Sequence, residues 1–338
     1  MSFIDLAANV NLERLSAEDS AEIANLLNAT WPVLYGKTGC LVFSEEYLRW
    51  LYGGPDSERH FIQGHRVNGE LVAVQAALFR RLSDGEKEWR AHIATHLAIS
   101  PELDLGKRVA LAAKVSEALA ADLGEGNLSI AYFEKGKGLV KSTRRIAEDR
   151  SAQNVREFPF RQAIVNPRKA QMLARTANGI STRVAEESDI PAIRTMVRGT
   201  NCALFLDPDP EALWHHITQA PGAQYLVAEE GSEVVGFLSS YVLDWNKDGQ
   251  ITRNIAVEVV LGDRPEILAV LLDRAVEQVK SVGARGVVLD NASYLDEQMA
   301  YESGVLPIPK EMVLVTRSSS AMTAEDATGD RGFLIDVK

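Results

Sequence analysis

The sequence predicts an α/β protein built as two similar domains in tandem, each with a mixed, mostly antiparallel sheet flanked by helices. The main observation is a repeat: both halves follow the order strand, helix, helix, three strands, long helix, strand, short helix and strand. Length supports two cores, because 338 residues suit two domains of about 150 residues each. Composition agrees, with 46% hydrophobic and 25% charged residues, as in soluble globular proteins.

The repeat sets the expected domain limits. We expect an N-terminal domain over residues 1–165 and a C-terminal domain over 181–318. Residues 166–180 are polar and basic without a strand pattern, so they are expected to form a partly helical linker. Residues 319–338 are mainly small and polar, which predicts a flexible tail.

Capping and turn residues place the elements of the first half. Ser16 precedes an amphipathic helix that is expected to reach Asn28, and Ser44 caps a second helix, EEYLRWLY. The alternating segments on either side of Asn68-Gly69 predict a hairpin. Further strands are expected at 10–15, 89–99, 128–133 and 158–164, and helices at 106–123 and 139–146.

The second half follows the same order. Pro265 suits the first turn of a long helix that ends near residue 282, and a hairpin is expected around Gly231-Ser232. Ser188 or Asp189 is the expected cap of the first helix. The predicted strands are 181–185, 225–229, 234–243, 251–261, 286–289 and 311–316, and the helices are 190–201, 210–219, 265–282 and 296–303.

Several functional classes lack their sequence signals. No apolar run approaches the roughly 20 residues of a membrane span, and the N-terminus does not resemble a secretory signal, so we expect a cytoplasmic protein without a membrane partner. Cys40 and Cys202 are too few for a disulfide framework or a metal cluster. His215 and His216 are adjacent and therefore point in different directions, so no metal site is expected.

The net charge indicates which classes of binding partner are favoured. A formal charge of −11 disfavours a nucleic-acid backbone and favours a partner with an amine. Motifs of serine hydrolases, P-loop NTPases and zinc proteins are missing from the sequence. The sequence leaves the oligomeric state open, a homodimer included.

One segment has the composition of a phosphate-binding turn. Residues 96–115, HLAISPELDLGKRVALAAKV, combine a strand, a proline and a basic turn with the start of a long helix. Amides at a helix N-terminus bind anions, and the helix dipole favours them. The segment resembles motif A of the GNAT superfamily of acyl-CoA-dependent N-acyltransferases, whose turn reads R/Q-x-x-G-x-G/A. Here Arg108 replaces the central glycine, and one extra residue follows Pro101-Glu102.

This resemblance implies a co-substrate, acetyl-CoA or another acyl-CoA, and no metal. The backbone and side chains that it implies as the cofactor site are Leu97, Ile99, Gly106, Lys107, Arg108, Val109 and Ala110. Residues 43–55, FSEEYLRWLYGGP, resemble an aromatic stretch that walls the acceptor site in some GNAT proteins. The same aromatic residues also have the helical spacing of core side chains, and both interpretations stay open.

The second half has a weaker phosphate turn but a clearer tyrosine motif. Its turn contains acidic Asp263 and Pro265, which has no amide hydrogen. Residues 296–305, DEQMAYESGV, resemble the GNAT A-x-x-x-Y-E-x-x-G-F stretch and place Tyr301 on the family's tyrosine. In the family this tyrosine protonates the leaving thiolate, so the resemblance makes Tyr301 a catalytic candidate.

Two further catalytic candidates lie on the third long strand of each half. In GNAT proteins this strand separates from its neighbour, exposes backbone N–H groups to the thioester carbonyl, and often carries the carboxylate base. Glu258 is a polar residue within the apolar strand IAVEVVLG, where an acid is costly unless it faces a cleft or a partner. His96 has a comparable place in the first half and titrates near neutral pH.

These features support three hypotheses. The first is an acyl-CoA-dependent N-acyltransferase, acting on an amine of a small molecule or peptide and using acetyl-CoA. The second is a catalytically degenerate tandem GNAT scaffold with a binding role. The third, an aminoacyl-tRNA-dependent transferase, conflicts with the acidic composition.

Overall fold

The first half of the chain forms helices and strands close to those expected from the sequence. The computed structural model describes residues 10–35, 39–83, 85–122, 128–134, 154–200, 202–206, 210, 214, 219–318 and 332–334. The elements of the first half are β1 (Glu13–Arg14), α2 (Ser20–Tyr35), β2 (Cys40–Val42), α3 (Glu45–Tyr52), β3 (Phe61–Val67), β4 (Glu70–Ser83), β5 (Glu88–Ile99), α4 (Leu105–Asp122), β6 (Leu128–Glu134) and β7 (Asn154–Val165).

The second half repeats this order after a short helix in the expected linker. Its elements are α6 (Pro167–Ala174), β8 (Ile180–Val184), α7 (Ile190–Arg198), β9 (Cys202–Leu206), β10 (Ala223–Glu230), β11 (Glu233–Lys247), β12 (Gln250–Gly262), α9 (Pro265–Val282), β13 (Val287–Leu289), α10 (Glu297–Glu302), β14 (Val305–Ser318) and β15 (Gly332–Leu334). The expected helix at 139–146, most of the one at 210–219, His215, His216 and most of the tail lie outside the described residues.

Local signals in the sequence set most element limits. The hairpin turn between β3 and β4 has Asn68 and Gly69 at φ of 54° and 86°, as a tight turn requires. Ser44 accepts a hydrogen bond from Tyr47 N and begins α3 as predicted. Gly283, at φ of 65°, ends α9 in the left-handed conformation. Several limits were wrong: α2 continues beyond Asn28 to Tyr35, β7 begins at Asn154 instead of 158, and β14 begins at Val305 instead of 311.

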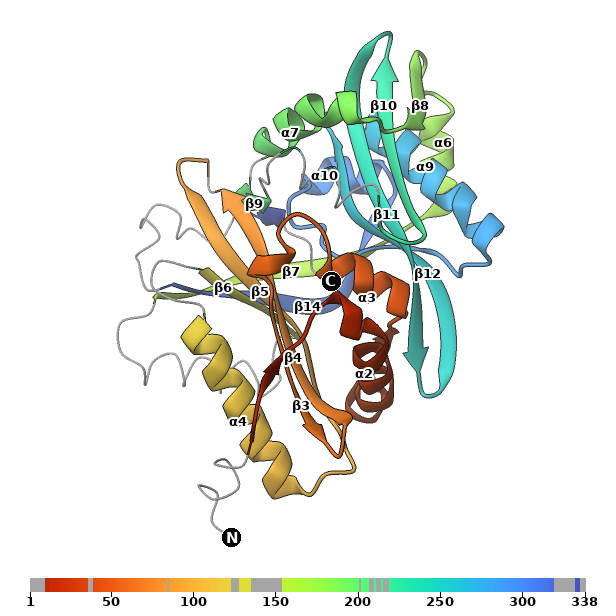
Figure 1. Cartoon of the computed structure of the whole chain (residues 1–338). Coiled ribbons are helices and arrows are strands. Elements are labelled where there is room, and N and C mark those ends of the chain that lie inside the picture. The colour runs from red at the N-terminus through yellow and green to blue at the C-terminus, as the bar shows by residue number, and fades with distance from the viewer. Residues whose placement is uncertain are drawn as a thin grey trace.

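The two halves share one continuous sheet. Its main path is β1-β3-β4-β5-β6-β14-β7-β13-β12-β11-β10-β8 (Figure 1). Two strands exchange neighbours: β7, from the first half, pairs with β13 of the second half, while β14, from the end of the second half, pairs with β6 of the first. The long β14–β7 ladder therefore connects the two halves at the centre of the sheet.

Two short strands that the sequence did not predict also cross between the halves. β2 pairs with β11, with Leu41 opposite Trp245. β9 pairs with the end of β4, with Leu206 opposite Leu82. Their partners lie far away in the sequence, so local periodicity does not reveal them. Together with β7 and β14, these pairings fix one half against the other.

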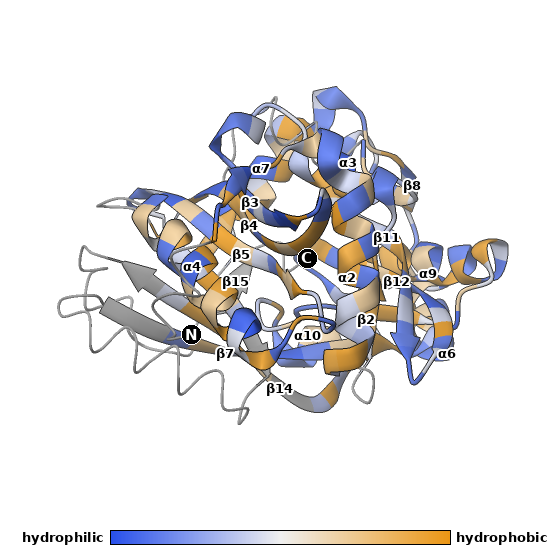
Figure 2. Ribbon diagram, turned by 60° about the horizontal axis from the view of Figure 1, so that its bottom comes forward, coloured by the Kyte–Doolittle hydropathy of each residue, from blue (hydrophilic) through white to orange (hydrophobic). Residues whose placement is uncertain are grey.

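Helices cover the sheet through their apolar faces, and several of them show both hydrophobic and hydrophilic stretches (Figure 2). One apolar cluster packs α9 and α10 against β10 to β13, and another lies among β4, β5, β6 and the ends of β7 and β14. The largest cluster contains side chains of both halves, from Leu15 to Tyr294. The junction between the halves is therefore a buried hydrophobic core.

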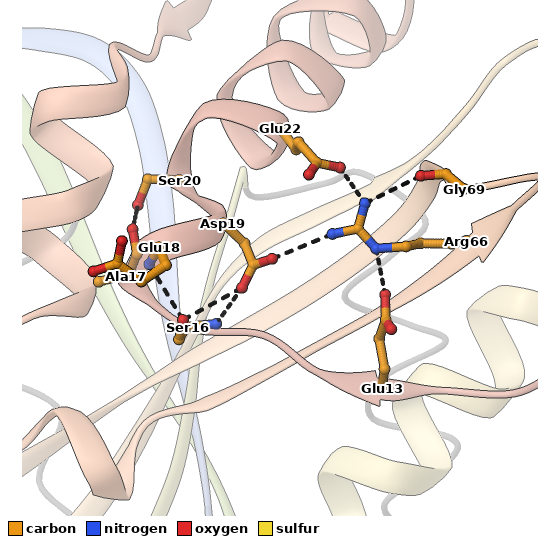
Figure 3. Close-up of polar contacts among 9 residues, drawn as sticks. All are labelled: Glu13, Ser16, Ala17, Glu18, Asp19, Ser20, Glu22, Arg66 and Gly69. Carbon is orange, nitrogen blue, oxygen red and sulfur yellow. Dashed lines mark hydrogen bonds and ion pairs between the residues drawn. The ribbon is translucent and has the colours of Figure 1, made fainter.

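A charged cluster fixes the start of α2 in the first half (Figure 3). Arg66, on β3, bonds to Glu13 on β1, to Asp19 in the turn before α2, and to Glu22 on α2. Asp19 also accepts from Ser16 N at 2.9 Å, so the carboxylate both caps the helix and binds the arginine. These contacts join the edge of the sheet to its first helix.

Candidate functional site

The strand β5 separates from its neighbour β6 near its end, where Leu97 O accepts from Trp31 Nε1 at 3.1 Å. Its parallel pairing with β6 runs from Ala91 to Ala94 and stops there. Beyond that point Ser100 donates its N–H to Val72 O, on β4, at 2.8 Å. Since successive N–H groups of a strand point to alternate edges, those of Leu97 and Ile99 face the side from which β6 has departed. These are the two backbone positions that the sequence predicted for the thioester.

The bulge before this edge contains His96. Gln75 pairs with Leu97 but Ala77 pairs with Ala94, so β5 has one more residue than β4 at this point. The Nδ1 atom of His96 lies 2.7 Å from the Tyr52 hydroxyl and 2.7 Å from the Thr95 hydroxyl. Burial lowers the pKa of His96 to about 3. The imidazole is therefore neutral at pH 7, and Nδ1 is hydrogen-bonded to the two hydroxyls.

The predicted phosphate turn lies at the start of α4. Lys107 N donates to the Asp104 carboxylate at 2.9 Å, and Lys107 Nζ lies 3.3 Å from the same group. The backbone hydrogen bond from Lys107 lowers the pKa of Asp104. Ala110 is buried, whereas Val109 is half exposed and Lys107 is exposed. The first turn thus already holds one anion, the carboxylate of Asp104.

Glu258 lies in a matching bulge of the second half. Ser240 pairs with Val257 and Ser239 with Val259, which leaves Glu258 as the extra residue of β12. Its side chain is buried, with 8% of its surface exposed. Burial raises the pKa of Tyr241, and the nearby Glu258 carboxylate raises it further. The acid that the sequence singled out therefore lies at the core between the halves.

A band of aromatic side chains runs across this core from His96 to the second half. Phe43 packs edge-on against His96 at 4.9 Å between ring centroids. Within this band the two halves meet at Trp50, on α3, and Tyr241, on β11, at 5.8 Å between ring centroids. Successive members of the band are Trp31, Phe43, Tyr47, Trp50, Tyr241 and Tyr225. The aromatic segment 43–55 thus lies between the two bulges, with Tyr47 and Tyr52 buried.

Tyr301 lies in a different environment. Its side chain is 61% exposed, and Lys169 Nζ is 3.2 Å from the centre of its ring. Glu258 is buried beside tyrosines of the junction, whereas Tyr301 lies on the surface of α10. The role of Tyr301 as the acid for the thiolate stays a prediction.

Over the described part of the chain, no group of three or more His, Cys, Asp or Glu side chains has the arrangement of a metal site. None of its helices has the length and apolar character that crossing a bilayer demands.

The sequence missed several neighbours of the candidate residues. The sequence indicates Tyr52 only as part of an aromatic segment, and it gives no signal for Thr95 or Tyr241. It also gives none for Tyr294, whose hydroxyl accepts a hydrogen bond from Val260 N on β12 at 2.9 Å. A polar side chain beside a bulge leaves no periodic pattern in the sequence, so its role depends on strand pairing that the sequence does not show.

Comparisons with known proteins give the fold. No family model matches the sequence, and no curated protein matches it. Among solved structures, Saccharomyces cerevisiae N-myristoyltransferase with bound myristoyl-CoA and inhibitors is similar at a TM-score of 0.66 and 11% identity, over 97% of this chain and 87% of that chain. A tandem GNAT protein from the clavulanic acid biosynthesis pathway is similar at 0.58 and 12%, over 93% and 100%.

A third similar structure is a probable N-acyltransferase from Enterococcus faecalis, at a TM-score of 0.52 and 10% identity, over 90% of this chain and 72% of that chain. Identities this low establish architecture and leave activity to the site residues. The mixed sheet, its flanking helices and the repeated element order agree with these structures. The chain therefore has the GNAT fold in its tandem form.

Proposed function

We propose that the chain is an acyl-CoA-dependent N-acyltransferase that binds its acyl-CoA at the N-terminal half. The observation behind this proposal is the open edge of β5, where Leu97 and Ile99 follow the last residue paired with β6. The basic first turn of α4 begins a few residues later. An unpaired strand edge beside a helix N-terminus offers donors to a thioester and to a pyrophosphate.

Each part of the co-substrate has a partner in this arrangement. The N–H groups of Leu97 and Ile99 donate to the acyl group and the adjoining amide of the CoA arm. The amides of Gly106 and Lys107 at the start of α4, with the charges of Lys107 and Arg108, hold the pyrophosphate. Pyrophosphate takes the place of the Asp104 carboxylate, which currently accepts from Lys107 N.

The chemistry needs a base and an acid. The free amine nitrogen attacks the thioester carbonyl carbon, the carbon–sulfur bond breaks, and the amine proton leaves. Glu258 is the proposed proton acceptor, because it is the buried carboxylate at the junction of the halves. The donor to the thiolate is Tyr301 or solvent, and Tyr301→Phe distinguishes the two. His96 is neutral and hydrogen-bonded to Tyr52 and Thr95, so its proposed role is to shape the acyl site.

The acyl group and the acceptor belong to the proposal. We propose acetyl-CoA as the co-substrate. A longer acyl-CoA is the second candidate, because one similar structure holds myristoyl-CoA. The acceptor is an amine of a small molecule or peptide, in keeping with the net charge of −11. The proposed compartment is the cytoplasm, and a homodimer is one possible assembly.

Isothermal titration with acetyl-CoA and with myristoyl-CoA tests the proposal. Arg108→Glu reverses a charge at the start of α4, and Arg264→Glu makes the same change at the start of α9. We expect at least tenfold weaker binding in Arg108→Glu and an unchanged affinity in Arg264→Glu. Failure of the wild-type protein to bind either acyl-CoA would overturn the proposal and leave a tandem scaffold with a binding role.

A further inference from the structure

The two halves contain the same strand arrangement at the candidate acyl site. β5 pairs with its parallel neighbour as far as Ala94, and β12 pairs with β13 as far as Val257. Leu97 is the third residue after Ala94, and Val260 is the third residue after Val257. Each of them follows a bulge on its own strand. Leu97 and Val260 therefore have equivalent places at the two edges.

The edge amide of the second half already has a partner. Val260 N donates to the Tyr294 hydroxyl at 2.9 Å, and the phenol is buried at 8% exposure. Tyr294 comes from the loop after β13, so it fills the space into which β13 would otherwise continue. Burial raises the pKa of Tyr294, which keeps the hydroxyl neutral at physiological pH. A neutral oxygen bonded to this N–H takes the position that a thioester oxygen needs.

The helix beside this edge differs from α4 in the same sense. Pro265 is the first residue of α9 and has no amide hydrogen to offer a phosphate. Arg264 is already bonded to Glu230 at 2.8 Å and lies 3.5 Å from the Asp263 carboxylate. In the second half, the N–H that a thioester would need is therefore already bonded to Tyr294. The pyrophosphate would meet Pro265, which has no N–H, and Arg264, which is already paired with Glu230.

We propose that Tyr294 is a built-in occupant of the C-terminal edge, so that the chain binds a single acyl-CoA, at Leu97 and Ile99. This inference rests on the proposed function for the N-terminal site, but the bond between Tyr294 and Val260 can be tested without it. Tyr294 acts as a positioning residue: it replaces the ligand in one copy of a duplicated site and holds the strand that includes Glu258.

Amide hydrogen exchange followed by NMR tests the occupant directly. In the wild-type protein Val260 should exchange slowly, and saturating acetyl-CoA should leave its rate unchanged while it slows exchange at Leu97 and Ile99. Tyr294→Phe removes the acceptor oxygen and keeps the ring, so Val260 should exchange about tenfold faster. Tyr35→Phe, on α2, is the matched control and should leave the Val260 rate unchanged.

Titration of the wild-type protein with acetyl-CoA gives the second readout, with one molecule bound per chain expected. Two molecules per chain, or slower exchange at Val260 on adding acetyl-CoA, would overturn the inference even if Tyr294→Phe failed to fold. Fast exchange at Val260 in the wild-type protein would also overturn it. Zero molecules bound would contradict the proposed function and the single-site count, while the exchange rates would still decide whether Tyr294 occupies the edge.

Discussion

The guanidinium of Arg183 donates two hydrogen bonds to the carboxylate of Asp189, at 2.6 and 2.8 Å. It also bonds to Glu229 on the neighbouring strand at 2.9 Å. The first half has the same tie between Arg66 and Asp19. There the arginine is on the inner strand of the pair and the glutamate on the outer one, whereas in the second half the two are exchanged. An arginine–aspartate ion pair at the start of the first helix, called the helix-start tie below, is thus common to both halves.

The first prediction concerns Arg183. Asp189 is only 5% exposed, so Arg183→Met leaves a buried carboxylate without its cation. We expect a loss of about 2–4 kcal/mol in the free energy of unfolding, measured in urea. Arg253→Met, which removes the partner of Asp244 at a more exposed pair, is the control and should cost about 0–1 kcal/mol. Equal losses in the two variants would contradict a special role for the helix-start tie.

Acid should reveal the same tie. Arg183 lowers the pKa of Asp189, so the folded state gains stability above the carboxyl's ordinary pKa of 3.8 and loses it as pH falls through the lower, folded value. In Arg183→Met this gain is missing. The stability difference between wild type and Arg183→Met should therefore shrink as pH falls below about 4. Urea unfolding curves at pH 7 and at acid pH measure it, and a constant difference would count against the assignment.

Much of the fold could be predicted from the sequence because many of its determinants are local. Asn68-Gly69 and Gly231-Ser232 mark two hairpins, and Pro265 and Gly283 mark the two ends of α9. The exchange of β7 and β14 could not be predicted, since their partners are chosen by burial over long sequence distances. The domain limits at 165 and 181 stay a prediction, because β7 and β14 serve both halves.

The candidate site was predictable to a lesser extent. Glu258 and His96 stood out as polar residues in apolar strands, and each proves to lie in a bulge of its strand. The protonation of His96 could not be inferred, because its low pKa results from burial in the folded protein. The sequence does not distinguish Tyr294 from any other loop tyrosine, and only the folded structure places its hydroxyl where it accepts from Val260 N.

A second prediction tests the close contact between β11 and α9. A Cβ atom added to Gly236 would lie 2.4 Å from Ile267 Cγ2 and 3.0 Å from Leu261 O. Gly236→Ala should therefore cost about 1–3 kcal/mol of unfolding free energy, because the helix must move away from the sheet. Gly286→Ala, where a Cβ meets no atom within 4 Å, is the matched control and should be nearly neutral. Thermal or urea unfolding compares them, and a neutral Gly236→Ala would show that α9 packs more loosely.

A third prediction follows from the buried imidazole. The pKa of His96 falls from an ordinary 6.5 to about 3 in the folded protein, so below pH 6.5 the unfolded chain binds a proton that the folded protein does not. His96 should therefore make stability fall as pH drops from about 6.5 toward 3, by at most about 1.4 kcal/mol per pH unit. His96→Gln keeps a polar side chain and removes this titration. In urea unfolding between pH 5 and 7, the free energy of unfolding should therefore depend less steeply on pH in the variant, by up to about 1.4 kcal/mol per pH unit. Equal slopes in the two proteins would refute the prediction.

The fourth prediction separates the two catalytic candidates, which lie in different surroundings. If Glu258 accepts the amine proton, Glu258→Gln should lower kcat by about 10²–10⁴-fold while the affinity for acyl-CoA stays the same. Tyr301→Phe should also lower kcat. The loss in kcat should be larger for a thioester whose leaving thiolate is more basic, because the lost hydroxyl protonates that sulfur. Steady-state kinetics with acetyl-CoA and an amine acceptor, combined with titration of each variant, distinguish these outcomes. An unchanged kcat in Tyr301→Phe would assign Tyr301 to the surface contact with Lys169, where its ring already lies 3.2 Å from the ammonium group. The thiolate would then take its proton from solvent, and Glu258 would be the remaining catalytic candidate of the second half.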